Sequence, residues 1–146
     1  MAFKFKLEKV LDYRKQLEEQ AMQALAEARA ARDAEAARLE ELRLELARQM
    51  QEMQSCAAAM TGSERWLTQN YIQALQYDVE YAQRNLASLE QVVAQRQNHL
   101  VQKAQERELL DKLKSKQAQR FAHEEKLKEQ RDNDETATIR FNKATV

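Results

Sequence analysis

The chain has 146 residues, of which 33% are charged, 6% are aromatic and none is proline. Its mean hydropathy of -0.84 leaves little apolar material for a globular core. The 24 basic and 24 acidic side chains cancel, which argues against a dedicated nucleic-acid-binding protein, because such a protein carries a basic face. The abundance of Ala, Glu, Lys, Leu, Arg and Gln is typical of a coiled coil or a long helix. Disorder is the competing interpretation, but disordered chains usually combine a large net charge with many Pro and Gly.

A first helix is predicted over residues 3–60. Its later part carries an apolar seam with the three-four spacing of a coiled coil, made of Leu39, Leu42, Leu46, Gln49, Met53, Cys56 and Met60. Its earlier part continues the helical periodicity with smaller side chains, namely Leu7, Val10, Leu11, Leu17, Ala21, Ala24, Leu25, Ala28 and Ala31. The N-terminal residues lack the apolar core of a secretory signal, and no apolar run is long enough to span a bilayer. With a single Cys, the chain is expected in a reducing, cytosolic compartment.

The turn is predicted at residues 61–63, which include the only Gly of the chain. A lone Gly inside a helix costs only about 1 kcal/mol relative to Ala, so Gly62 alone does not establish a break. Thr61 and Glu64 have the spacing of a capping box, in which each side chain satisfies a free backbone N–H of the other residue. Ser63 is the alternative N-cap. The chain is therefore expected to fold back on itself here.

A second helix is predicted over residues 64–131, followed by a frayed tail at 132–146 that is rich in poor helix formers. Its seam is apolar as far as Val93 and increasingly polar afterwards, and it consists of Ile72, Leu75, Val79, Ala82, Leu86, Leu89, Val93, Arg96, Leu100, Lys103, Arg107, Leu110, Lys114, Gln117 and Phe121. The predicted fold is all-α, a long antiparallel two-helix coiled-coil hairpin forming one domain over 1–146. A parallel dimer of long helices fits the turn signals less well, and whether the hairpin itself dimerises stays open.

No constellation of residues indicates catalysis, a cofactor, a metal or a small-molecule substrate, so the chain is not expected to be an enzyme. His99 and His123 lie too far apart in the sequence to form a metal-binding pair. Cys56 has no CxxC partner and is interpreted as a seam residue. No Gly-rich phosphate loop is present, because the only Gly lies in the turn.

Two surfaces are candidates for binding partners. Four aromatic residues near the turn either wrap the edge of the seam or form a docking patch, since Tyr and Trp are favoured at interfaces: Trp66, Tyr71, Tyr77 and Tyr81. At the opposite end, apolar residues of the first arm are expected to meet those of the second, with Phe3, Phe5, Leu7, Val10, Leu11 and Tyr13 against Leu109, Leu110, Leu113 and Phe121. The basic residues that accompany them are available to a partner, namely Lys4, Lys6, Lys9, Arg14, Lys112, Lys114 and Lys116.

Three stretches, taken in order, resemble the FliJ family of bacterial flagellar export proteins. The first is the opening FKFKLEKVLDYRKQLEEQA, the second is Arg65-Trp66 leading into YIQAL, and the third is LLDKLKSKQ with the acidic and aromatic residues that follow it. Together they cover nearly the whole chain.

The resemblance implies an antiparallel two-helix coiled coil similar to the central stalk subunit of rotary ATP synthases. It also implies a cytoplasmic place in the flagellar type III export apparatus, with three partners: the hexameric export ATPase, the membrane export gate and the export chaperones. By this analogy the basic terminal end enters the ATPase ring and the turn-side half faces the gate. An equivalent stalk protein of a virulence secretion system and a generic coiled-coil scaffold or chaperone are the alternatives.

Overall fold

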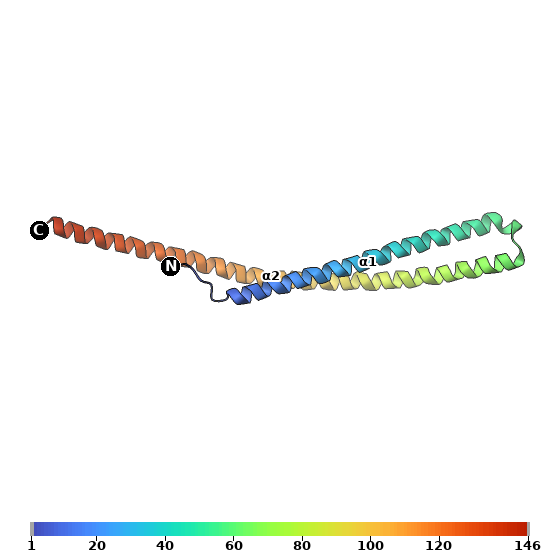
Figure 1. The fold of residues 1–146 in the computed structure, drawn as a ribbon, viewed down its shortest axis with the longest axis horizontal. Coiled ribbons are helices and arrows are strands. Elements are labelled where there is room, and N and C mark those ends of the chain that lie inside the picture. The colour runs from blue at the N-terminus through green and yellow to red at the C-terminus, as the bar shows by residue number, and fades with distance from the viewer. Residues whose placement is uncertain (1, 146) are drawn as a thin grey trace. The chain divides into compact units, whose positions relative to one another are not determined.

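A computed structural model describes residues 2–145 and consists of two long helices joined by a short connection (Figure 1). Helix α1 covers Glu8–Cys56, a single 3-10 turn η1 covers Ala57–Ala59, and helix α2 covers Gly62–Ala144. The part of the chain that is described contains no β-strand. The all-α helical hairpin predicted from the sequence is confirmed.

The packing divides the hairpin into two units, each of which contains a piece of both helices. The terminal unit consists of the chain up to Glu19 together with the chain from Gln102 onward. The turn unit is Gln20–Val101.

The core of the turn unit is a narrow row of small and medium apolar side chains between the helices. Its buried members are Ala21, Leu25 and Leu39 of α1 and Leu75, Ala82 and Val93 of α2. These residues keep the three-four spacing that brings one stripe of each helix to the interface. Because the row is only one side chain deep, most other seam residues remain partly exposed to water.

The sequence prediction of the seam fails at a few positions in this unit. Ala31, Cys56 and Arg96 are exposed, whereas Arg32 and Glu35 are partly buried in the interface. The apolar Ala31 is out of phase with the buried row, and the in-phase steps between Ala28 and Leu39 fall on the two charged residues. Helical phase therefore decides burial here, and hydrophobicity does not.

The connection between the helices is built from local hydrogen bonds. The hydroxyl of Thr61 accepts from the backbone N–H of Glu64 at 3.2 Å, and the Glu64 carboxylate accepts from the N–H of Thr61 at 3.2 Å. The predicted capping box is thus confirmed. On the other side of the turn, Arg65 donates to the carbonyl of Ala57 at 2.6 Å, which satisfies a carbonyl near the end of α1. Gly62 has no positive φ angle, so the turn does not require Gly.

In the terminal unit, α1 begins at Glu8 and not at residue 3 as expected. Residues 2–5 before it have no regular secondary structure and residues 6–7 form a turn, with the N–H of Glu8 donating to the carbonyl of Phe5 at 3.2 Å. This segment lets bulky aromatic side chains reach α2. The rings of Phe3 and Phe121 lie 5.7 Å apart, and Phe5 and Leu11 are buried. The aromatic contact predicted for this end is present.

Other apolar residues expected in this contact are exposed: Leu7, Val10, Tyr13, Leu109 and Leu113. Their positions lie at the edge of the seam or on the outer side of the helices. A two-helix interface covers only one stripe of each helix, so these residues have no third element to cover them.

Helix α2 continues far beyond its last contact with α1. The sequence predicts that it ends near Arg131 with a frayed tail over 132–146, whereas the helix extends to Ala144; residue 146 lies outside the described part. Within this extension, Thr136 and Thr138 donate their hydroxyl hydrogens to the carbonyls four residues earlier. Adding residues to an existing helix costs far less than starting a new one, so a few weak helix formers do not end it. After Phe121 every described residue is exposed, and α2 continues as a single helix (Figure 1).

Candidate partner-binding surfaces

The basic residues predicted to bind a partner all belong to the terminal unit, but they fall into two groups. Arg14 forms an ion pair with Glu106 at 2.7 Å, and Lys114 forms one with Glu8 at 2.8 Å. These pairs cross from one helix to the other. Their positive charges are therefore already balanced within the hairpin, and they contribute less to an outward-facing basic surface.

The remaining members of the set are free to act on a partner. They are exposed and have no ion pair within 4.0 Å to another residue in the described part of the chain: Lys4, Lys6, Lys9, Lys112 and Lys116. These five Lys side chains add exposed positive charge to the terminal unit, even though the whole chain has no net charge.

Interhelical charge pairs accompany the buried apolar residues of the terminal unit. Arg107 pairs with Glu18 across the interface, and the hydrogen bond to Glu18 is the main reason that the pKa of Arg107 is raised. The pKa of Lys114 is likewise raised, chiefly by its hydrogen bond to Glu8. These pairs fix the alignment of the two helices. They also keep the antiparallel order, because Glu8 at the start of α1 meets Lys114 of α2, whereas Arg14 and Glu18, further along α1, meet the earlier residues Glu106 and Arg107.

The aromatic residues predicted near the turn belong to the turn unit, and all four are exposed. Their exposed fractions are 63% for Trp66, 45% for Tyr71, 62% for Tyr77 and 64% for Tyr81. Most of the aromatic surface is therefore outside the seam. Leu67 is also 61% exposed and lies one turn before Tyr71 on the same side of α2.

Tyr71 differs from the other three because it is attached to α1. Its hydroxyl donates to the carboxylate of Glu45 at 3.3 Å, and that carboxylate also accepts hydrogen bonds from Arg48 and Gln49. Desolvation, followed by the nearby charge of Glu45, raises the pKa of Tyr71. The bond to Arg48 is the largest cause of the lowered pKa of Glu45. Tyr71 is thus held in one orientation, while Trp66, Tyr77 and Tyr81 have no comparable hydrogen bond within the described residues.

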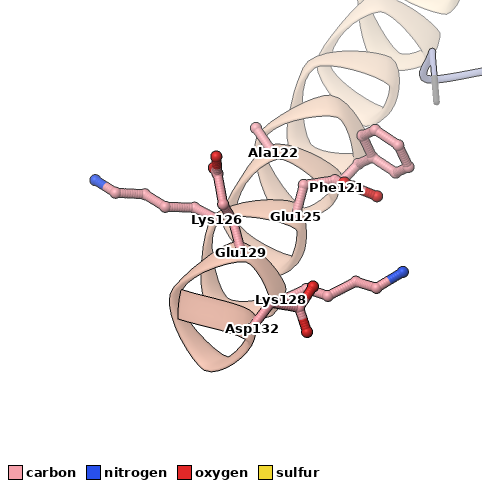
Figure 2. A pocket seen from close by; sticks show the side chains of 7 residues that line it. All are labelled: Phe121, Ala122, Glu125, Lys126, Lys128, Glu129 and Asp132. Carbon is pink, nitrogen blue, oxygen red and sulfur yellow. The ribbon is translucent and has the colours of Figure 1, made fainter. Parts of the chain in front are cut away.

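The surface has several shallow hollows that are candidates for binding pockets. One, of about 670 Å³, lies alongside the single-helix part of α2 and is lined by Phe121, Ala122, Glu125, Lys126, Lys128, Glu129 and Asp132. Figure 2 shows that these side chains project in several directions from one helix, with the Lys126 and Lys128 amino groups on opposite sides. They do not enclose a ligand, so this hollow is open surface.

Groups that would support metal or nucleophilic chemistry are not gathered. Within residues 2–145 no cluster of three metal-ligating side chains occurs. His99 and His123 are exposed, and Cys56 is an exposed free thiol that lies 3.7 Å from the Ser55 hydroxyl. Cys56 is therefore not the seam residue that the sequence suggested.

Sequence reasoning missed two features of these surfaces. The first is the Glu18–Arg107 pair, which depends on a register that hydrophobic spacing does not determine. The second is one oxygen of the Glu35 carboxylate, which is buried without a hydrogen-bond partner in the described structure. A charged residue at an in-phase position of the seam is the signal that would have identified Glu35.

A helical hairpin whose distinctive residues are exposed charges and exposed aromatic rings belongs to the class of proteins that act through contacts with other macromolecules. A profile of the flagellar FliJ protein family matches residues 3–145, nearly the whole chain. The chain therefore belongs to the FliJ family, and its role lies in flagellar protein export. No curated protein and no solved structure shows a significant match. None of the described helices is long and apolar enough to cross a membrane.

Proposed function

We propose that this chain is a non-enzymatic coiled-coil stalk of the flagellar protein export apparatus. In this role it links the hexameric export ATPase to the cytoplasmic domain of the membrane export gate and assists the delivery of substrates bound to export chaperones. The observation that carries the proposal is the match to the FliJ family over residues 3–145. The family favours a flagellar apparatus over a virulence secretion system or a generic scaffold.

The ATPase contact is assigned to the terminal unit. The five exposed Lys residues provide positive charge that attracts an acidic surface and raises the rate of association. Arg14 and Lys114 remain in the assigned set, but their ion pairs within the hairpin give them a supporting role. They hold the two helices in register so that the free Lys side chains are presented from both.

The gate contact is assigned to the exposed aromatic residues of the turn unit. Trp and Tyr combine a large apolar area with few rotatable bonds, which is why they dominate binding energy at many interfaces. Trp66, Tyr77 and Tyr81 provide the area, and Tyr71 provides a fixed point through its bond to Glu45. Binding there gives the protein a peripheral place at the inner membrane, at the base of the flagellum. No cofactor is needed for this role.

Stimulation of a purified flagellar export ATPase tests the first contact. The wild-type chain is expected to raise the ATP hydrolysis rate or the hexamer population, and Lys112→Glu with Lys116→Glu is expected to remove most of the effect. The matched control is Lys126→Glu with Lys128→Glu, which reverses two exposed charges of α2 beyond the hairpin. If both double variants behave alike, or if the wild-type chain has no effect, the ATPase contact is wrong.

Binding to the purified cytoplasmic domain of the export gate tests the second contact. Tyr77→Ala with Tyr81→Ala is expected to weaken binding by at least about tenfold, which corresponds to about 1.4 kcal/mol. Tyr13→Ala is the control, because Tyr13 is similarly exposed but belongs to the terminal unit. Wild-type affinity in the double variant would exclude the aromatic patch as the gate contact.

A further inference from the structure

We infer that one edge of the terminal unit is a docking groove for an acidic amphipathic helix of a partner protein. The groove is defined by four exposed apolar residues, which we call the terminal edge strip: Val10 and Tyr13 of α1 and Leu109 and Leu113 of α2. Their exposed fractions are 41%, 57%, 68% and 37%. The identity of the partner rests on the ATPase contact proposed above for the terminal unit. The chemistry of the docked segment follows from the residues of the strip alone.

The four residues lie at the same level along the two helices. The ion pairs between Glu8 and Lys114 and between Arg14 and Glu106 enclose this segment at its two ends. Residues 8–14 of α1 therefore run alongside residues 106–114 of α2. In this antiparallel alignment Val10 is level with Leu113, and Tyr13 is level with Leu109.

The four residues also share one edge of the hairpin. In the turn unit, Tyr71 and Glu45 each come directly before a partly buried seam residue, and they bond to each other across the helices. Residues that directly precede seam positions thus meet on one edge of an antiparallel pair. Val10 directly precedes buried Leu11, and Leu113 directly precedes partly buried Lys114.

Helical spacing places the other two members of the strip on the same side. Tyr13 lies three residues after Val10, and Leu109 lies four residues before Leu113, which are the spacings of neighbours on a helix surface. The strip is consequently an apolar line shared by both helices. A third helix with apolar residues every three to four positions fits such a groove.

The charges around the strip determine the character of the helix that would bind. Lys9 adjoins the strip on α1, and Lys112 and Lys116 adjoin it on α2, all exposed and without an ion pair in the described structure. Of the neighbouring acidic residues, Glu106 pairs with Arg14 at 2.7 Å and Glu108 lies 4.0 Å from Arg107, while Asp12 is exposed and has no ion pair within the described residues. The three Lys side chains outnumber Asp12, so net positive charge borders the apolar line, and a docked helix with Glu or Asp on its flanks complements it.

An anionic membrane surface is the other chemistry that basic and apolar residues attract. Membrane binding is favoured when one helix presents a wide apolar face. Here the apolar residues are divided between two helices and form a line along the groove, which suits a helix better than a bilayer.

Fluorescence anisotropy with two labelled helical peptides tests the inference on the full chain. Each peptide has about 28 residues, because helices shorter than about 15 residues are marginal in water. One carries Leu at the seam positions and Glu on the flanks, and its twin carries Lys in place of Glu. The wild-type chain is expected to bind the Glu peptide at least tenfold more tightly than the Lys peptide.

Two double variants identify the site. Leu109→Ser with Leu113→Ser is expected to weaken binding of the Glu peptide by at least tenfold. Leu127→Ser with Ile139→Ser is the matched control, because both residues are exposed on α2 but lie outside the strip, and it is expected to bind like the wild type. Circular dichroism of each variant checks that the helices remain folded.

Three results would overturn the inference. Two come from the anisotropy assay: equal binding of the two peptides, or unchanged binding of the Glu peptide to the Leu109→Ser and Leu113→Ser variant. The third comes from a vesicle-binding assay, in which the chain binds vesicles that contain phosphatidylglycerol but binds neither peptide. The ATPase assay separates this inference from the proposed function. If the chain stimulates the export ATPase but does not bind the Glu peptide, the groove is wrong and the stalk role survives. If it binds the peptide through the strip but has no effect on the ATPase, the groove stands and the ATPase contact is wrong.

Discussion

Leu11 is the residue whose removal tests the packing of the terminal unit most directly. It is 0% exposed, and it is the only large side chain in the described residues that is completely enclosed. Leu11→Ala removes three carbon groups, which at about 0.8 kcal/mol each represent about 2.4 kcal/mol of transfer free energy. Buried Leu→Ala substitutions usually cost about 2–5 kcal/mol in total. Because a two-helix interface can close around a small cavity, we expect a loss near the lower limit, about 2–3 kcal/mol.

Urea unfolding followed by far-ultraviolet circular dichroism measures this loss. Leu44→Ala is the control, because Leu44 is 63% exposed and surface substitutions of this kind usually change the free energy of unfolding by less than about 0.5 kcal/mol. Amide hydrogen exchange over residues 8–19 shows whether the terminal unit opens by itself. A loss below about 1 kcal/mol for Leu11→Ala, with unchanged exchange, would refute the assigned packing of this unit.

Three further predictions concern the turn and its neighbourhood. Thr61→Ala removes one half of the capping box and should lower the free energy of unfolding by about 1 kcal/mol; no loss in urea unfolding would mean that the cap does not stabilise α2. Gly62→Ala should raise it by about 0.4–1 kcal/mol, because Gly62 has no positive φ and nothing within 4 Å of an added Cβ; a loss in the same assay would contradict this. The raised pKa of Tyr71 means that its contribution to stability is present below the ordinary pKa of tyrosine and is lost as pH rises through the higher folded-state value. Ultraviolet titration of phenolate absorbance should show this group ionising at lower pH after Glu45→Gln, and an unchanged titration would exclude Glu45 as a cause.

The parts of the fold that local chemistry determines were predictable from the sequence. The Thr61 and Glu64 capping box needs only the right residues at the right spacing, and both hydrogen bonds form. The seam of α2 as far as Val93 is predicted by apolar residues that keep the three-four spacing without interruption. In these regions the local sequence alone is sufficient to predict the structure.

Other parts depend on information that spacing does not carry. Arg32 and Glu35 occupy the seam because the helical phase carries them there, although their side chains are charged. The partner of Arg107 depends on helix register, because a shift of one turn brings different charges together. The end of α2 differs from the prediction because Asp, Asn and Thr residues after Arg131 have low helix propensity, yet an existing helix extends through residues that would not start one.

The candidate surfaces were predictable as groups but not in detail. The exposure of Trp66, Tyr77 and Tyr81 follows from their positions outside the seam. The hydrogen bond that holds Tyr71 does not, since Glu45 lies 26 residues away on the other helix. Which of the basic residues of the terminal unit form ion pairs was not predictable either, because it depends on contacts with Glu8 and Glu106 across the helix interface.

The locally bonded turn has a consequence for the order in which the chain folds. The contact between Arg65 and Ala57 closes a segment of only 8 residues, whereas the pair between Lys114 and Glu8 closes one of 106. Loop-closure entropy grows with the logarithm of length, so making the distant contact first costs about 2 kcal/mol more than making the near one first. Pairing of α1 with α2 should therefore start at the turn and proceed toward the termini. Each new contact between the helices then closes only a short additional loop. During synthesis, the 49 residues of α1 must wait for residues beyond Gly62 before this pairing can begin.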